Sequence, residues 1–333
     1  MNRILCALLC ALPLPMAYAA DVSGQDRALA VGEALIGTPA PRLTLTTLDG
    51  QQIDLGQYYG KRPVYLKFWA TWCVPCLQQM PHLKHVYETA PKDLVVIAVN
   101  TNFNETTEAV KNYRERQGLK MPLVMDDGRL ASALNLRVTP QHVLIARDGR
   151  IAYVSHLADA ALDEALAAIE RPGSHAPRFA ASHAIHEGKP RAMRTLAGQD
   201  FILKDPKHTA TVLMFLSTWC EGYLKDSRPE ASTQCRAARL KGEQLTKRSD
   251  LRILGIASGL WANNADLHEY QKANDVHMPL ALDASGTAFR AFQVKQVPAV
   301  VILGSDGREQ LRLSGDLSGL DAALRKMQGA TGG

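Results

Sequence analysis

The chain has 333 residues, of which 46% are hydrophobic and 21% are charged. This is the composition of an ordinary globular protein, and the length is sufficient for two domains with separate cores. The 38 lysine and arginine residues exceed the 33 aspartate and glutamate residues by a net charge of +5, without any basic run dense enough to indicate nucleic-acid binding. We therefore expect no nucleic-acid partner.

The N-terminus has the pattern of an export signal. Arg3 supplies a positive charge, residues 4–16 form an apolar stretch, and residues 17–19 read Ala-Tyr-Ala, a small-x-small cleavage site. The apolar stretch is too short to span a bilayer comfortably. We therefore predict a signal peptide over residues 1–20, cleaved near residues 19–21, and a periplasmic mature protein. An uncleaved membrane anchor is the alternative interpretation.

Two of the six cysteines, Cys6 and Cys10, lie inside the predicted signal peptide. Each follows a leucine instead of the small residue that a lipidated cysteine requires, so we expect both to be removed on cleavage. An exported protein resides where disulfides form and persist. The remaining cysteines are too few for a disulfide scaffold, and we expect them to be working residues. They are Cys73, Cys76, Cys220 and Cys235.

The sequence repeats itself once. Similar stretches occur twice in the same order, which indicates two copies of one unit. The offset between them grows from 147 to 158 along the chain, so the second copy carries about ten extra residues after its first cysteine. The matched landmarks are Cys73 and Cys220, residues 121–128 and 278–286, and residues 138–150 and 296–308.

Each copy has the same predicted order of elements. A continuous apolar run, typical of a buried central parallel strand, precedes the first cysteine. A helix, a strand and a second helix follow, and then two strands that turn on Asp-Gly, which is a hairpin signal. A short helix closes the copy. The segments are 63–70, 77–90, 93–100, 105–118, 142–155 and 159–170 in the first copy, and 210–217, 251–258, 264–275, 299–313 and 317–328 in the second.

This alternation of strands and helices predicts an α/β fold in which each copy has a central mixed β-sheet flanked by helices. We expect one domain over residues 37–170 and a second over residues 185–328. The segment between the copies is rich in proline, glycine, alanine and histidine. We interpret residues 171–184 as a linker.

The Cys-Val-Pro-Cys motif of the first copy indicates redox chemistry. It follows the predicted central strand and begins a helix, a position that lowers the pKa of a thiol because the helix N-terminus favours the thiolate. Cys73 is expected to attack a disulfide, and Cys76, about one helical turn later, to resolve the mixed disulfide. Trp72 and Pro75 are expected to shape the turn and limit access. The alternative, half of a zinc site, would need a second pair of ligands at matching spacing, and none follows.

The stretch "FWATWCVPC", followed by "VTPQHVLI", resembles the thioredoxin superfamily, most closely the exported TlpA/ResA-like thiol-disulfide oxidoreductases. The resemblance covers residues 37–170 with specific motifs and residues 185–328 with degraded ones. It implies two tandem thioredoxin-like domains. It also implies that Pro140 is a cis-proline facing the active-site disulfide, in a loop that binds the substrate backbone, and that Thr139 tunes redox behaviour.

Lys67 departs from the thioredoxin pattern. Thioredoxin has a buried aspartate six residues before the first cysteine of the motif, and this chain has Lys67 there. A buried amine at this position would stabilise thiolates or act as a base if its pKa falls. Alternatively, the stem packs while the ammonium group reaches water. The histidines His82, His85 and His142 are expected at the surface.

The motif of the second copy, "FLSTWCEGY", has Tyr223 where the second cysteine would stand. Pro298 keeps the position of the facing proline. Cys235 lies 15 residues after Cys220, within the extra residues. On one straight helix these cysteines would be roughly 22 Å apart, but Pro229 breaks such a helix. We therefore predict a Cys220–Cys235 disulfide.

The role of the second pair stays open. A permanent structural disulfide and a redox-active pair with a distant resolving cysteine are both compatible with the sequence. Independent thiols, or a copper site that includes His277 or Met278, are further alternatives, because soft sulfur ligands suit Cu(I). The close-spaced cysteine pair usual in copper-delivery proteins of this fold is absent. We expect no cofactor and no metal.

The resemblance implies an enzyme, a thiol-disulfide oxidoreductase that reduces protein disulfides through Cys73 and Cys76. Its partners would be disulfide-bearing client proteins and a membrane thiol-disulfide reductase that supplies electrons, since the compartment is oxidising. Isomerase and oxidase activities need the same residues. A different class of function is a client- or copper-binding module in which the first domain keeps the cysteines of the second reduced.

Overall fold

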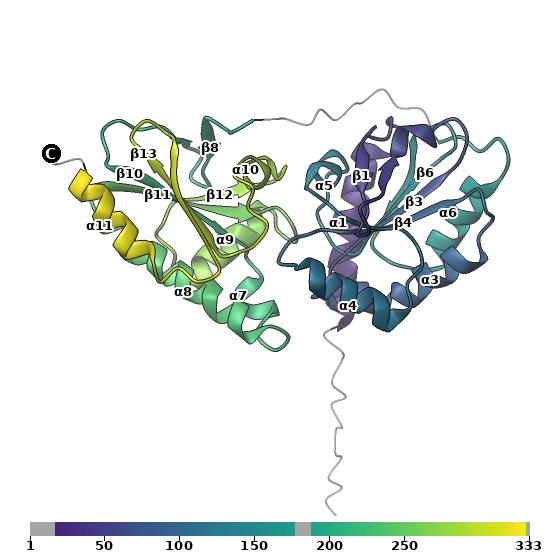
Figure 1. Ribbon diagram of the computed structural model, residues 1–333, viewed down its shortest axis with the longest axis horizontal. Helices are drawn as coiled ribbons and strands as arrows, with labels where there is room; N and C mark the ends of the chain where they lie inside the picture. The colour runs from purple at the N-terminus through teal and green to yellow at the C-terminus, as the bar shows by residue number, and fades with distance from the viewer. Residues whose placement is uncertain (1–16, 177–187, 331–333) are drawn as a thin grey trace, which may run out of the picture.

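The structure of the protein, a computed structural model, describes residues 17–176 and 188–330, with the backbone alone at 17–23 and 328–330. Within these ranges the chain forms two α/β units that meet in the middle of the molecule (Figure 1). Each unit is built on a five-stranded sheet and carries a separate two-stranded hairpin ahead of it. The fold class expected from the sequence, two tandem thioredoxin-like domains, is confirmed.

The sheet of the first unit has the strand order β5-β4-β3-β6-β7. Strands β3, β4 and β5 run parallel to one another, β6 runs antiparallel to β3, and β7 runs antiparallel to β6. The continuous apolar runs in the sequence explain why β3 and β4 lie at the centre of the sheet, because both strands are buried along their whole length. The elements are α1 (Ala17–Leu35), β1 (Thr44–Thr46), β2 (Gln52–Asp54), η1 (Leu55–Gln57), β3 (Val64–Trp69), α2 (Val74–Gln78), α3 (Met80–Thr89), β4 (Val95–Asn100), α4 (Thr107–Gln117), β5 (Leu123–Met125), α5 (Arg129–Ala133), β6 (Gln141–Ile145), β7 (Ile151–Ser155) and α6 (Ala160–Glu170).

The second unit repeats this arrangement in its sheet, β12-β11-β10-β13-β14. The extra residues that the offsets predicted form a longer helix, α8, after the motif. The elements are β8 (Ala192–Arg194), β9 (Asp200–Ile202), β10 (Ala210–Leu216), α7 (Cys220–Tyr223), α8 (Pro229–Leu245), β11 (Leu251–Ser258), α9 (Asn264–Ala273), β12 (Leu280–Asp283), α10 (Thr287–Ala291), β13 (Ala299–Gly304), β14 (Glu309–Ser314) and α11 (Leu320–Ala330).

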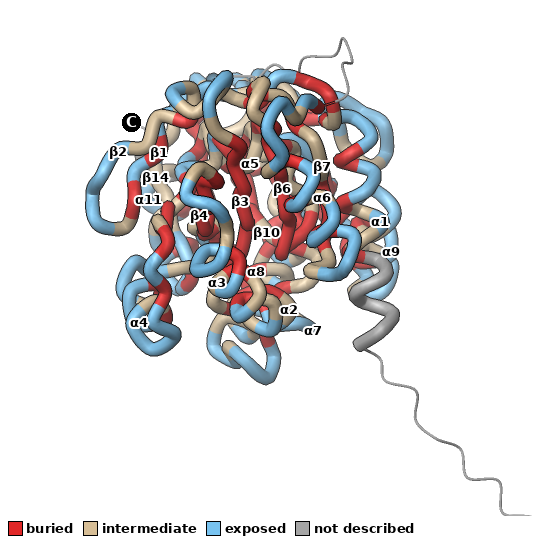
Figure 2. Tube along the Cα trace, turned by 90° about the vertical axis from the view of Figure 1, so that its right-hand side faces the viewer, coloured by how far each residue is buried: buried red, intermediate tan, exposed pale blue. Residues whose placement is uncertain are grey.

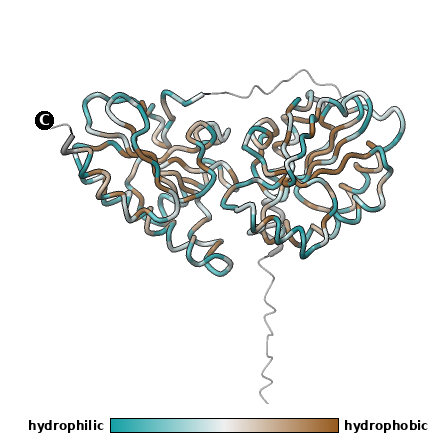
Figure 3. Tube along the Cα trace, viewed as in Figure 1, coloured by the Kyte–Doolittle hydropathy of each residue, from teal (hydrophilic) through white to brown (hydrophobic). Residues whose placement is uncertain are grey.

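Apolar side chains are concentrated on the central strands. Figure 2 shows β3, β4 and β6 as buried, and Figure 3 shows hydrophobic residues along the strands and hydrophilic ones on the outer faces of the helices. One hydrophobic cluster is confined to the first unit and another to the second. A third contains residues of both, among them Trp72 and Phe215. The two cores are therefore continuous across the junction between the units.

Helix α1 is an element that the sequence analysis did not anticipate, and it lies ahead of residue 37, the predicted start of the first domain. Val31 and Leu35 pack into the core of the first unit. Gln25 Oε1 accepts hydrogen bonds from the backbone N–H groups of His156 and Leu157 at 2.8 and 3.1 Å. The helix is therefore fastened to the end of β7 by both apolar and polar contacts.

The predicted signal peptide, residues 1–20, lies outside the residues whose side chains the structure describes. Most of the predicted linker, from residue 177 onward, also lies outside them. The boundaries proposed for the two domains stay predictions. Of the helices within 17–176 and 188–330, none has the length and apolar character needed to cross a membrane.

Candidate active site

Cys73 and Cys76 lie where the central strand β3 gives way to helix α2. Cys73 is the N-cap residue of α2, and its Sγ accepts a hydrogen bond from the Cys76 backbone N–H at 3.3 Å. The two sulfurs form a disulfide, with the Cα atoms 5.2 Å apart, and both side chains are buried. After reduction, the same N–H and the start of the helix favour the thiolate form of Cys73.

The other residues expected around this disulfide are brought together. The Thr139–Pro140 peptide bond is cis, as the resemblance implied. The carbonyl oxygen of Thr139 lies 3.4 Å from Cys73 Sγ. Trp72 Nε1 donates a hydrogen bond to the carbonyl oxygen of Phe103 at 2.7 Å, which fixes the indole beside the motif. Pro75 stands in the first turn of α2, where a missing N–H costs nothing.

Lys67, on β3, is completely buried beneath the motif. Its Nζ donates a hydrogen bond to the Cys76 carbonyl oxygen at 3.5 Å. Burial penalises the charged ammonium form and lowers the pKa of Lys67 to about 7. The interpretation in which the ammonium group reaches water is therefore wrong. Near neutral pH the amine is divided between its charged and neutral forms, and the neutral form is able to accept a proton.

A series of buried, hydrogen-bonded polar side chains lies beside Lys67. The Tyr65 hydroxyl donates to His142 Nδ1 at 2.7 Å, and His142 Nε2 donates to Gln79 Oε1 at 2.9 Å. Gln79 Nε2 in turn donates to the His156 carbonyl oxygen at 3.2 Å. Burial, followed by the positive charge of Lys67, holds the pKa of His142 well below its usual value, so the imidazole is neutral.

His142 was expected at the surface, and this expectation is wrong, because the residue is fully buried. It lies directly opposite Lys67 in the antiparallel ladder of β3 and β6. The signal that the sequence analysis missed is its position, two residues after Pro140 in a strand that is buried on both faces. Polar residues in such a strand need partners, and His142 has two.

The second unit lacks this polar chemistry. Met214 stands six residues before Cys220, as Lys67 stands six residues before Cys73. In the ladder of β10 and β13, Met214 is opposite Val300, at the position that corresponds to His142. Both second-unit residues are buried and apolar. The groups that could move or hold a proton beside the first disulfide are therefore replaced by hydrocarbon and thioether groups beside the second.

Cys220 and Cys235 form a disulfide, as predicted, with Cα atoms 6.2 Å apart. The bond joins the start of α7 to α8. Helix α7 ends at Tyr223, and Pro229 begins α8, so the chain turns back between the two helices as the proline indicated. The Val297–Pro298 peptide bond is cis, and Pro298 and Cys235 line the same small cavity. The second motif thus keeps a facing proline and a disulfide.

The alternative of a copper site finds little support in the arrangement of the nearby side chains. Met278 is buried, but His277 is largely exposed, and its Nδ1 lies 3.4 Å from the Glu243 carboxylate. Cys220 and Cys235 are bonded to each other and are not free thiolates. Among the residues that the structure describes, no three His, Cys, Asp or Glu side chains gather closely enough to hold a metal ion.

We expect Lys67→Met to raise the apparent pKa of Cys76 by about one unit, because the variant lacks the amine that takes up the thiol proton and the cation that favours thiolate. Resolution of a mixed disulfide on Cys73 should then shift to higher pH. The measurement is the rate of this resolution against pH, with Lys111→Met on the exposed face of α4 as the control. Superimposable profiles for Lys67→Met and the wild type would show that the amine takes no part.

The first unit is similar to known redox proteins. The Redoxin family matches residues 35–169. Thiol-disulfide oxidoreductase ResA of Halalkalibacterium halodurans is 37% identical over 131 residues, which is 39% of this chain and 70% of that protein. ResA of Bacillus thuringiensis (strain Al Hakam) is 36% identical over 118 residues, which is 35% of this chain and 66% of that protein, so the chain spans just under two thirds of this relative. A solved thiol:disulfide interchange protein of the thioredoxin family from Chlorobium tepidum TLS is 26% identical, covers 40% of this chain and 97% of its own, and has a TM-score of 0.37.

Proposed function

Because the chain belongs to the ResA-like thiol-disulfide oxidoreductases, we propose that it exchanges thiols and disulfides with client proteins through Cys73 and Cys76. The observation that carries this proposal is the Cys73–Cys76 disulfide at the start of α2, with a hydrogen-bond donor already directed at the Cys73 sulfur. A thiolate produced there by reduction is the nucleophile that disulfide exchange requires.

The exchange proceeds in two displacements. In the first, the Cys73 thiolate attacks one sulfur of a client disulfide, a Cys73–client bond forms, and the second client sulfur leaves as a thiolate. In the second, Cys76 attacks Cys73, the Cys73–Cys76 bond forms, and the first client sulfur leaves. The client gains two electrons and two protons, and the protein loses them.

Lys67 is suited to move a proton during the second displacement. The Cys76 thiol must lose its proton before it attacks, because the thiolate is the nucleophile. The neutral amine of Lys67 is the base nearest to the Cys76 backbone among the contacts described above. Proton transfer to it creates an ion pair inside the protein, and the ammonium then returns the proton to the departing client sulfur or to water.

We propose that clients are reduced rather than oxidised. A strongly oxidising pair is one whose reduced form is stabilised. Here Cys73 Sγ accepts from one backbone N–H, and the nearby lysine loses much of its charge on burial. This limited stabilisation of thiolates favours the disulfide and makes the dithiol a donor of electrons. Because the signal-like N-terminus supports export to the periplasm, a membrane thiol-disulfide reductase is the proposed source of those electrons.

The test is the reduction potential of each cysteine pair, measured in redox buffers. For Cys73–Cys76 we expect a value close to the potential of thioredoxin, about −270 mV. A value close to that of the oxidant DsbA, about −120 mV, would overturn the proposed direction. Client reduction by the Cys220→Ala/Cys235→Ala variant should match the wild type. Loss of client reduction in this variant would instead favour the function in which the first domain maintains the cysteines of the second.

A further inference from the structure

The second unit covers the face of the first on which clients are proposed to bind. The contact is made by the loop between β11 and α9. The backbone N–H of Trp261 donates to the carbonyl oxygen of Arg137 at 2.8 Å, and its indole N–H donates to Thr139 Oγ1 at 3.3 Å. The indole also meets the ring of His156 edge-on, with centroids 5.6 Å apart. This loop therefore lies along the segment that leads into Pro140.

The first unit makes the same kind of contact with the second. In the loop between β4 and α4, the backbone N–H of Asn104 donates to the carbonyl oxygen of Lys295 at 2.8 Å. The side-chain Oδ1 of Asn104 accepts from the backbone N–H of Val297 at 2.8 Å. Asn104 and Trp261 differ by 157 in number, and Arg137 and Lys295 by 158, which are the offsets of the sequence repeat. The units are thus docked through equivalent surfaces.

The two docking loops also have the same backbone conformation at equivalent positions. Asn104 has a φ of 52° and Trp261 a φ of 57°, both in the left-handed region. Asparagine adopts this conformation readily, whereas for a bulky aromatic residue it is rare and strained. The strained conformation of Trp261 directs its N–H groups at the first unit, so the docking contacts and the strain are coupled.

The two motif turns also meet. The indole of Trp72 stacks on that of Trp219, with ring centroids 4.9 Å apart and an interplanar angle of 26°. The Val74 backbone N–H, between the two active-site cysteines, donates to the Tyr223 hydroxyl at 3.0 Å. Tyr223, the residue in place of the missing cysteine, is therefore a contact to the first motif.

Arg228 adds hydrogen bonds between the two units next to these rings. Its guanidinium donates to Thr71 Oγ1 at 2.7 Å and to the Asn104 carbonyl oxygen at 2.5 Å. It also lies 3.7 Å from the carboxylate of Glu105, whose side chain is fully buried. Glu105 accepts from both the backbone and the side chain of Thr71. Separation of the units would expose these groups to water, which can take over their hydrogen bonds.

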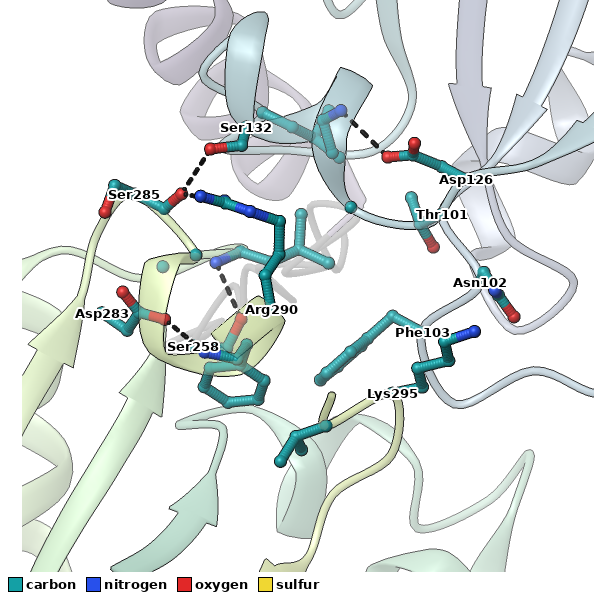
Figure 4. Close-up of a pocket in the computed structure, with 18 of the residues that line it drawn as sticks. Thr101, Asn102, Phe103, Asp126, Ser132, Ser258, Asp283, Ser285, Arg290 and Lys295 are labelled. Atoms are coloured by element: carbon teal, nitrogen blue, oxygen red, sulfur yellow. Dashed lines mark hydrogen bonds between the residues drawn. The ribbon is translucent and has the colours of Figure 1, made fainter. Parts of the chain in front are cut away.

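Packing is incomplete elsewhere at the junction. A cavity of about 360 Å³ lies between the units (Figure 4), lined by residues of both such as Phe103 and Arg290. At its edge the Ser132 hydroxyl donates to the carbonyl oxygen of Ser285 at 2.8 Å, as Figure 4 shows. An interface that combines polar contacts with an open cavity is of the kind that allows relative motion of domains.

We propose that the second domain is a tethered occupant of the client-binding face of the first, and that the structure is the closed form of a protein that opens to receive clients. This inference rests on the proposed function. While the units are docked, Cys73 is 1% exposed and Thr139 is fully buried, so a client disulfide cannot reach the sulfur. The second domain thus competes with clients for the same surface.

The test uses the full-length protein with the Cys73–Cys76 pair reduced by a mild thiol buffer and the Cys220–Cys235 bond intact. It measures the rate at which a maleimide labels Cys73, followed by mass spectrometry. Two variants weaken docking without changing any residue of the first unit: Arg228→Ala removes the hydrogen bonds of the guanidinium, and Trp261→Gly removes the indole while keeping the left-handed backbone accessible. We expect each to speed labelling at least about tenfold, because each removes hydrogen bonds that include charged or buried groups. Arg308→Ala, at an exposed turn where the side chain is 86% exposed, should label as the wild type does.

Peptide mapping of the Cys220–Cys235 bond confirms that each variant is folded, and faster amide exchange at Val74 and Asn104 would report separation independently. Unchanged labelling and exchange in both folded variants would overturn the inference. The outcome is separable from the proposed function. If labelling of the variants is faster but the protein reduces no client, the closed form is supported and the proposed function is overturned. If client reduction is normal but labelling is unchanged, the closed form is overturned and the proposed function is supported.

Discussion

Cys76→Ser is expected to accumulate mixed disulfides with client proteins, joined through Cys73. The geometry supports the proposed roles of the two cysteines. Cys73 is at the N-cap of α2, beside the Thr139 carbonyl oxygen in the loop that is proposed to bind the client. Cys76 is one helical turn further in, with no exposed surface and with Lys67 beneath it. Without Cys76, release depends on an external thiol instead of a sulfur already in place, and oriented intramolecular groups reach effective molarities of about 10⁵ M or more. Turnover should fall by several orders of magnitude.

Cys73→Ser is the matched control, because it keeps the proposed resolving cysteine and removes the proposed attacking one. We expect it to form no client complex and to show no turnover. The measurement is non-reducing electrophoresis and mass spectrometry of protein recovered with its clients, in a background where Cys220 and Cys235 are intact. Equal trapping by Cys73→Ser and Cys76→Ser would show that the roles have been assigned wrongly.

Removal of the Cys220–Cys235 bond is expected to destabilise the second domain by about 3 kcal/mol, the loop-closure entropy for a loop of this length at 25 °C. The cysteines are 15 positions apart, and their bond connects helices that are also joined by the ion pair between Arg239 and Glu221 at 2.8 Å. Urea unfolding of Cys220→Ala/Cys235→Ala under non-reducing conditions gives the difference. Removal of the Cys73–Cys76 bond, which closes a much shorter loop, should cost about 2 kcal/mol. A second-domain variant as stable as the wild type would contradict a structural role.

We also expect the Cys220–Cys235 bond to stay oxidised in a mild thiol buffer that reduces Cys73–Cys76. Cys220 Sγ lies 3.8 Å from the carbonyl oxygen of Ala231, an acceptor that does not stabilise a thiolate. Met214 and Val300 offer neither charge nor proton where Lys67 and His142 stand in the first domain. Equilibration of both pairs at similar potentials would show instead that the second pair is redox-active.

Much of the fold was predictable because its signals are local. Continuous apolar runs indicated β3 and β10, Asp-Gly indicated the hairpins, and the spacing of Cys73 and Cys76 indicated their chemistry. The Cys220–Cys235 bond was also within reach, because Pro229 limits how far a helix can continue. Each of these inferences depends on residues that are close together in the sequence.

The features that were missed or left open depend on distant neighbours. Lys67 and His142 are buried because their strands are covered on both faces, and the alternation of polar and apolar residues that would reveal their orientation is absent from such strands. Helix α1 has only a weak apolar stripe in its sequence. Asn104 and Trp261 look like ordinary loop residues, and their role appears only when the two copies are placed against each other.

The docked arrangement also affects the tryptophan fluorescence of the protein. The sequence has four tryptophans, and three of them, Trp72, Trp219 and Trp261, lie where the units meet. The stacked pair, Trp72 and Trp219, is adjacent in sequence to Cys73 and Cys220, and disulfides quench indole fluorescence. Separation of the units breaks this pair apart and places its rings in water, whereas Trp69, packed on Tyr113 inside the first unit, stays as it is. The protein therefore contains its own optical probe of opening, with an internal reference, and needs no added label.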